Sequence, residues 1–380
     1  MITPNSMQQQ ADNIVNIYAK LEQDIFSLLI KSVNNSDWDK INADNAMMWQ
    51  VEQLSKMRAL TRDVIILVAK SNKVSERELT NLVKRNGLQI VSEIDTKLQD
   101  IMNRQVSVGA DTTNMLDSVI RQTFLDINNN VNQTLITTNY ENNAAMRTFQ
   151  SIVKQSVLEV TSGLKTPEKA VRDNIYKWVD NGIQTTLVDK GGNSWSLESY
   201  SRLVINATAH RTFNDLRLKR MKDFGMGQAL MSSHAAAREA CAHIQGTVVN
   251  VVTSDNEAYN PKYDSIYNHG YGTFAGTQGA NCSHTLTPFD PDVNTDVTPK
   301  HYDPDEAIKR GKEQQKQRNM ERAIRASKKR LAAAKQLKDT DMESKMKSRI
   351  SNQQKNLREF IGDKDYLGRD YSREQIYSKQ

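Results

Sequence analysis

The sequence predicts a predominantly helical α+β protein, with long helices at both ends of the chain and a small mixed module between them. Three observations support this fold class. Only 16 glycines and 7 prolines occur among 380 residues, whereas proteins built from strands and tight turns use many of both. Apolar residues recur every three or four positions through residues 1–180 and again beyond residue 301, as on one face of an amphipathic helix. Strand-like stretches fall between residues 181 and 300.

The first predicted region, residues 1–180, consists of successive helices. Apolar side chains keep one-face spacing over residues 8–30 and over residues 51–69. Ser75 followed by Glu78 matches a capping box, in which the two side chains satisfy free backbone N–H groups at a helix start. We therefore expect a helix to begin there, and we interpret the whole region as a surface for assembly with other proteins.

The second predicted region, residues 181–300, is a small α+β module. Gly191 and Gly192 lie between two short strand-like runs, which is typical of a β-hairpin. The expected elements are, in order, a β-hairpin over 183–196, a helix over 197–222, strands over 228–233 and 247–253, and loops over 254–300.

The third predicted region, residues 301–380, is a charged helical hairpin. It holds 21 Lys and Arg against 13 Asp and Glu, whereas the preceding 300 residues hold 30 and 32. Thr340 and Glu343 match a second capping box, which predicts that a helix restarts after a short break. The apolar stripe of this hairpin is thin, so we expect it to pack on a partner surface. The charge asymmetry indicates a polyanionic partner, and a merely solvated helical surface is the alternative.

Positive charge is densest between residues 309 and 358, which hold 17 basic and 5 acidic side chains and no aromatic residue. A surface of this kind binds nucleic acid through phosphates rather than through bases. The chain has no helix-turn-helix or zinc-finger pattern, so base-specific recognition is not expected. The predicted contacts to double-stranded DNA are six residues within four helical turns: Arg318, Arg322, Arg325, Lys328, Lys329 and Arg330.

Both cysteines, Cys241 and Cys282, share one short region with His234 and His284. One interpretation is a structural metal site, because two Cys and two His can complete the tetrahedral shell of zinc. A second is catalysis or anion binding by a Cys241–His284 pair or by His234 with Arg238. A third is a core in which these polar side chains tie loops to a small sheet. The sequence leaves all three open, and zinc is the one cofactor that they imply.

Several classes of protein are disfavoured. GxSxG, HExxH, P-loop and dinucleotide-binding motifs are absent from the sequence, so we do not expect an enzyme. The longest apolar run, residues 64–69, is far shorter than the roughly 20 residues that span a membrane, and no secretory signal is visible. Two cysteines are too few for a disulfide scaffold. We expect assembly in the cytoplasm without membrane contact.

A string of short motifs covers residues 175–290: Tyr200-Ser201-Arg202-Leu203-Val204, Ser232-Ser233-His234, Ala237-Arg238, Cys241, Gln245-Gly246, Tyr271-Gly272, Gly279-x-Asn281-Cys282-x-His284 and Pro288-Phe289. Together these motifs resemble the phage minor capsid protein 2 family, which is related to Mu-type head-morphogenesis minor head proteins. Ser283 stands where the family usually has a basic residue, and Asp290-Pro291-Asp292 replaces a common Pro-Gly turn. The motif residues expected to have a structural role are Arg238, Gln245, Gly246 and Asn281.

The resemblance implies a minor structural protein of a tailed-phage head. It implies binding to the portal protein at the portal vertex, inside the capsid of the virion, where the basic region would contact packaged double-stranded DNA and aid assembly or DNA delivery. Contacts with other head proteins and with further copies of the chain are also expected. The alternative is an enzyme or effector that uses the His/Cys cluster, with or without zinc, to act on nucleic acid or protein.

Overall fold

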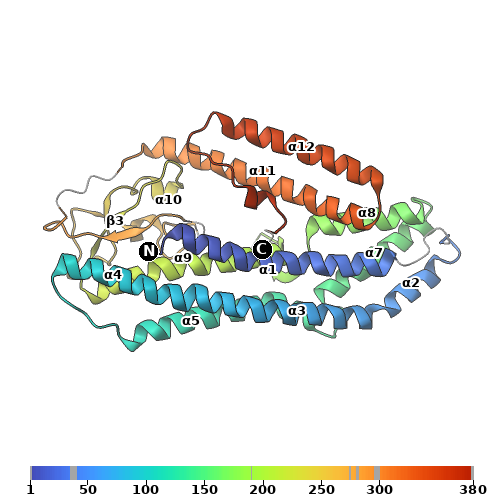
Figure 1. Ribbon diagram of the computed structural model, residues 1–380, viewed down its shortest axis with the longest axis horizontal. Coiled ribbons are helices and arrows are strands. Elements are labelled where there is room, and N and C mark those ends of the chain that lie inside the picture. The colour runs from blue at the N-terminus through green and yellow to red at the C-terminus, as the bar shows by residue number, and fades with distance from the viewer. Residues whose placement is uncertain are drawn as a thin grey trace.

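The computed structural model confirms the predominantly helical α+β fold. Long helices run side by side along the longest axis of an elongated molecule, and a small sheet lies at one end (Figure 1). Among the described residues, no helix is both long and apolar enough to cross a lipid bilayer. The structure describes residues 2–34, 41–189, 191–273, 275–279, 282–294 and 300–377.

The larger part of the molecule is a helical bundle whose members turn apolar faces towards a shared core. Tyr18, Phe149 and Tyr176 are among the largest side chains enclosed in this core. The bundle helices are α1 (Pro4–Asn34), α2 (Ala46–Ser55), α3 (Met57–Thr80), α4 (Asn86–Met102), α5 (Ala110–Ile127), α6 (Gln133–Ile136), α7 (Ala144–Thr161), α8 (Pro167–Asn181) and α9 (Leu197–Asp223).

One predicted helix start is wrong. Ser75 is buried inside α3, with its hydroxyl oxygen 2.9 Å from that of Tyr18 in α1. Its hydroxyl donates to the carbonyl of Asn72 instead of capping a new helix. A π-helical turn, Asn81–Arg85, joins α3 directly to α4, and a similar turn, Asn128–Asn132, joins α5 to α6. Burial of this face of α3 against α1 therefore outweighs the local capping pattern.

Two short sheets follow α8 in the chain. β1 (Gln184–Val188) and β2 (Ser194–Ser196) form the predicted antiparallel hairpin. The second sheet has the strand order β5-β4-β3-β6, in which β3 is antiparallel to both neighbours and β4 is parallel to β5. Its strands are β3 (Gln228–Met231), β4 (Val248–Asn250), β5 (Asp264–Ser265) and β6 (Leu286–Pro288). β5 and β6 lie in the stretch predicted as loop, because two or three residues are too few to show strand alternation.

Among the described residues, α4 and α9 contribute to both of the two larger hydrophobic cores. α4 places Ile90 in the bundle core and Ile94 in the smaller core that includes the four-stranded sheet. α9 likewise places Leu216 in the first core and Met221 in the second, and Phe224, which follows the last residue of α9, also lies in the second. The cores are therefore contiguous along these helices. The functional boundaries expected near residues 180 and 300 stay predictions.

The C-terminal region is the predicted helical hairpin. α11 (Pro304–Gln336) packs on α8 and α1, and α12 (Thr340–Gly362) lies on its outer side (Figure 1). Asp339, one residue before the predicted cap, caps α12, because its carboxylate accepts the N–H of Met342 at 3.0 Å. Leu337 of the thin apolar stripe is buried in the bundle core. The partner surface expected for this stripe is therefore the protein's own bundle.

Candidate functional site: a thiol–imidazole cluster and a basic hairpin

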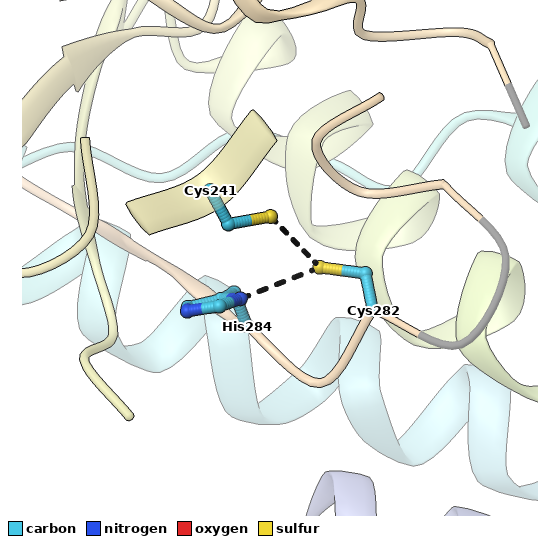
Figure 2. Close-up of side chains that lie close together, drawn as sticks. All are labelled: Cys241, Cys282 and His284. Atoms are coloured by element: carbon cyan, nitrogen blue, oxygen red, sulfur yellow. Dashed lines mark hydrogen bonds between the residues drawn. The ribbon is translucent and has the colours of Figure 1, made fainter. Parts of the chain in front are cut away.

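Cys241, Cys282 and His284 converge on one buried point (Figure 2). The two Sγ atoms lie 3.8 Å apart, and Sγ of Cys282 lies 3.5 Å from Nδ1 of His284. One donor atom from each residue lies within 4.8 Å of the other two. None of the three residues is more than 5% exposed. The structure thus brings together three of the four residues predicted as metal ligands.

The antiparallel pairing of β3 with β6 explains why distant segments meet here. Beyond the end of β3, the N–H of Ser232 donates to the carbonyl of Thr285 at 2.9 Å. Cys282 lies just before β6 in the chain, and Cys241 lies in the short helix α10 (Glu239–Ala242), which follows β3. Both cysteines are therefore held at the same end of the sheet.

Gly246 lets the chain turn back from α10 towards β4. Its φ is +70°, in the left-handed region that glycine adopts more readily than other residues. A Cβ at this position would lie 2.8 Å from the carbonyl oxygen of Lys300. The N–H of Gly246 donates to the carbonyl of Met231 at 3.0 Å. A side chain here would strain the backbone and crowd the connection that carries Cys241.

Gln245 sets the orientation of His284. The side chain of Gln245 is buried, and one amide atom lies 2.9 Å from the backbone N of His234 and 3.0 Å from Nε2 of His284. Because a backbone N–H can only donate, this amide atom is the oxygen, and Nε2 of His284 must carry a proton. Nδ1 of the same ring then points at Sγ of Cys282, 3.5 Å away.

A further histidine, His210 on α9, lies close enough to Cys282 to affect the pKa of its thiol and was not among the predicted ligands. The hydrogen bond with Cys241 lowers the pKa of Cys282 well below its usual range, and hydrogen bonds with His210 and His284 act in the same direction, while burial opposes them. The same thiol–thiol hydrogen bond raises the pKa of Cys241. Nε2 of His210 lies 2.9 Å from the side-chain amide of Asn214. Sequence spacing gave no signal for His210, because it lies in a different predicted element.

The remaining motif residues lie around this group. The ring of His234 packs edge-on against that of His284, with centroids 4.5 Å apart, and its Nε2 lies 3.3 Å from the carbonyl oxygen of Ser283. Burial lowers the pKa of His234. Arg238 donates to the carbonyl of Gly276 at 3.2 Å. The structure therefore does not place His234 in the group of three donors.

The burial of the cluster bears on whether its role is catalytic or structural. A catalytic thiol needs a cleft that admits a substrate, whereas Cys241 is only 1% exposed. Burial therefore favours a structural role for the cluster over a catalytic one. Asn281, the remaining motif residue, lies outside the described residues.

The basic hairpin is attached to the bundle through Lys329. Its Nζ lies 2.8 Å from Oε2 of Glu22 on α1 and 2.6 Å from Oε2 of Glu198 on α9. Glu22 is fully buried, and its other oxygen accepts the N–H of Ile183 at 3.1 Å. Burial would raise the pKa of Glu198, but the nearby charges of Lys329 and Arg325 outweigh it and lower that pKa to about 2. Lys329 therefore serves as a buried partner of two carboxylates.

The other five predicted DNA contacts also have partners within the chain. Arg318 pairs with Glu321 at 3.1 Å, and Arg330 pairs with Asp180 on α8 at 2.8 Å. Arg325 donates to the carbonyl of Arg373 at 3.2 Å, and Lys328 donates to the side chain of Gln375 at 3.0 Å. Arg322 is exposed.

A different set of basic side chains faces solvent. Within residues 304–362, eleven basic residues are exposed, against four acidic ones. The exposed basic residues are Lys309, Lys312, Lys316, Arg322, Lys335, Lys338, Lys345, Lys347, Arg349, Lys355 and Arg358. We refer to them as the outer basic surface. It differs from the predicted set because α11 packs its most basic segment against the bundle.

Comparison with known proteins agrees with a structural role and defines the class: this is a phage structural protein. The chain belongs to the family described as phage minor capsid protein 2, whose model matches residues 2–362. It is 42% identical over 365 residues to a structural protein of Lactococcus phage LL-H, covering 95% of this chain and 98% of the relative. It is 45% identical over 118 residues to a structural protein of Lactococcus phage mv4, covering 31% of this chain and 95% of that relative. No solved structure matches significantly. The family predicted from the motif string is confirmed.

Proposed function

We propose that this minor capsid protein binds inside the phage head at the portal vertex and contacts packaged DNA through its outer basic surface. The observation that supports the DNA contact is the charge of the exposed surface along α11 and α12. Eleven basic residues are exposed there, against four acidic ones. Family membership supports a place among the head proteins. The portal protein and other head proteins are the proposed partners, and an aid to assembly or DNA delivery is the proposed role.

One side of the hairpin packs on the bundle, and the other side faces solvent. Lys329 and Arg330 attach α11 to the bundle through ion pairs. The outer basic surface remains available to phosphates, which it would bind by displacing counterions without contacts to bases. The absence of aromatic residues between 309 and 358 fits this mode, because stacking on bases needs aromatic side chains.

Binding of the full chain to unrelated duplexes should be independent of sequence and should fall steeply with salt. About six phosphate contacts predict a log–log salt slope near −5, at roughly −0.9 per contact. Replacing Lys347, Lys355 and Arg358, which lie on one side of α12, with Gln should bring the slope closer to zero by up to about three units. Fluorescence anisotropy across a salt series measures the slope.

A variant with the same loss of charge provides the control. Arg58, Arg62 and Lys70 are exposed on α3 of the bundle, and their replacement by Gln should leave the slope unchanged. An equal effect of both variants would mean that binding follows net charge rather than the outer basic surface. A flat salt response of the wild-type chain would contradict the DNA contact.

Location in the head is tested separately. Chemical cross-linking of intact heads, followed by mass spectrometry, should join lysines of this chain to the portal protein. Cross-links to the major capsid protein alone, with none to the portal protein, would contradict the portal-vertex placement while leaving the DNA contact intact.

A further inference from the structure

We propose that Cys241, Cys282, His284 and His210 form a buried structural site for a soft divalent metal ion, with zinc as the ion of choice. The proposal does not depend on the role of the hairpin. Three of these donors already lie within 4.8 Å of one another, and His210, outside that group of three, lies close enough to Cys282 to lower the pKa of its thiol. It replaces His234 of the predicted ligand set with His210.

The distances within the cluster match those of a tetrahedral zinc shell. With Zn–S bonds of about 2.3 Å and Zn–N bonds of about 2.0–2.1 Å, tetrahedral angles place two sulfurs about 3.8 Å apart and a sulfur and a nitrogen about 3.6 Å apart. The observed separations are 3.8 Å between the two Sγ atoms and 3.5 Å between Cys282 Sγ and His284 Nδ1. A disulfide would instead require sulfurs about 2.05 Å apart.

The surroundings of His284 are those of a metal-binding imidazole. A ligating histidine usually donates its second ring N–H to an acceptor, which fixes the tautomer and the orientation of the ring. The buried oxygen of Gln245 does this for Nε2 of His284 and leaves Nδ1 directed at Cys282. A disulfide would not need this orientation of His284.

Charge balance also favours the ion. Isolated charges are costly in a buried position, but two thiolates, two neutral imidazoles and one divalent ion sum to zero. The site would join α9, α10 and the segment before β6, which are the elements around the smaller core. That core is built on strands of only two to four residues, so a metal crosslink would contribute much of its rigidity.

The test uses the full chain purified from zinc-supplemented cells under reducing conditions. Elemental analysis should find about one equivalent of zinc. Cys241→Ser, Cys282→Ser and His284→Gln should each lose it, whereas His243→Gln should retain it, because His243 is exposed beside α10. Circular dichroism checks that each variant is folded. Wild-type protein without stoichiometric zinc, or with a Cys241–Cys282 disulfide, would overturn the proposal.

A second measurement does not depend on the folding of the variants. Exchange of zinc for Co²⁺ in the wild-type chain should produce a thiolate-to-cobalt charge-transfer band, and the absence of that band would contradict two thiolate ligands. His210→Gln should weaken zinc binding, and His234→Gln should not. The reverse result would refute the assignment of His210 as the fourth ligand.

Discussion

Replacing Lys329 with Met should lower the free energy of unfolding by about 3–5 kcal/mol, because removal of one partner leaves buried charge uncompensated. Nζ of Lys329 lies within 2.8 Å of carboxylates from both Glu22 and Glu198. Met keeps most of the volume of the side chain, so the loss would be mainly electrostatic. Urea unfolding followed by circular dichroism measures it.

Lys335→Met is the matched control, because Lys335 is exposed on the same helix and a surface substitution should change stability by less than about 0.5 kcal/mol. Addition of Glu198→Gln to the Lys329→Met variant should recover part of the loss, since one unpaired carboxylate is removed. Equal stability of the Lys329→Met and Lys335→Met variants would show that the buried ion pairs contribute nothing.

The same ion pairs predict how stability depends on pH. The pKa of Glu198 falls from its ordinary value of 4.5 to about 2 in the folded chain. A lowered carboxyl pKa adds stability that is fully present above pH 4.5 and is lost as pH falls through about 2. The wild-type chain should therefore lose stability between about pH 4.5 and pH 2, and the Lys329→Met variant should lose less over the same range.

Replacing Arg220 with Met should also destabilise the protein by about 3–5 kcal/mol. Arg220 is fully buried on α9 and binds both oxygens of Asp95 on α4, at 2.6 and 2.9 Å. It also donates to the carbonyl of Val106 at 2.8 Å and to Asp223 at 2.8 Å. Its loss would leave Asp95 buried without its cation where α4 packs against α9.

Lys222→Met serves as the control for Arg220→Met, because Lys222 is exposed on the same turn of α9. Thermal unfolding of the two variants side by side gives the comparison. A similar melting temperature for both would mean that Arg220 is only a space-filling residue. Addition of Asp95→Asn to the Arg220→Met variant should restore part of the stability if the unpaired carboxylate causes the loss.

Local sequence patterns predicted the elements of this fold better than the contacts between them. Helical periodicity predicted α1, and the capping box at Thr340 and Glu343 predicted the helix restart that makes the hairpin. Both patterns depend only on neighbouring residues. The helix start at Ser75 was wrong because burial against Tyr18, 57 positions away, decided the outcome. β5 and β6 exist only through pairing with other strands, so no local pattern indicated them.

The same limit applies to the sites. Cys241, Cys282 and His284 were predicted together, because residue type and chain proximity suffice to suggest a cluster. His210 was missed, since only the packing of α9 brings it near. Lys328 and Lys329 are adjacent and identical in type, yet Lys328 contacts Gln375 and Lys329 contacts two bundle carboxylates. That difference is set by distant acidic residues and not by the basic segment itself.

The pairing of Glu22 with Lys329 spans 307 positions of the chain and therefore has a consequence for synthesis. At roughly 5–20 residues per second on the ribosome, about 15–60 seconds separate the appearance of the two residues. Until Lys329 emerges, Glu22 has no cation to accompany it into the interior, so α1 must keep that face in water. Packing of α1 into the bundle thus waits until the last fifth of the chain has been synthesised. A nascent chain that stops before Lys329 should therefore remain sensitive to proteolysis.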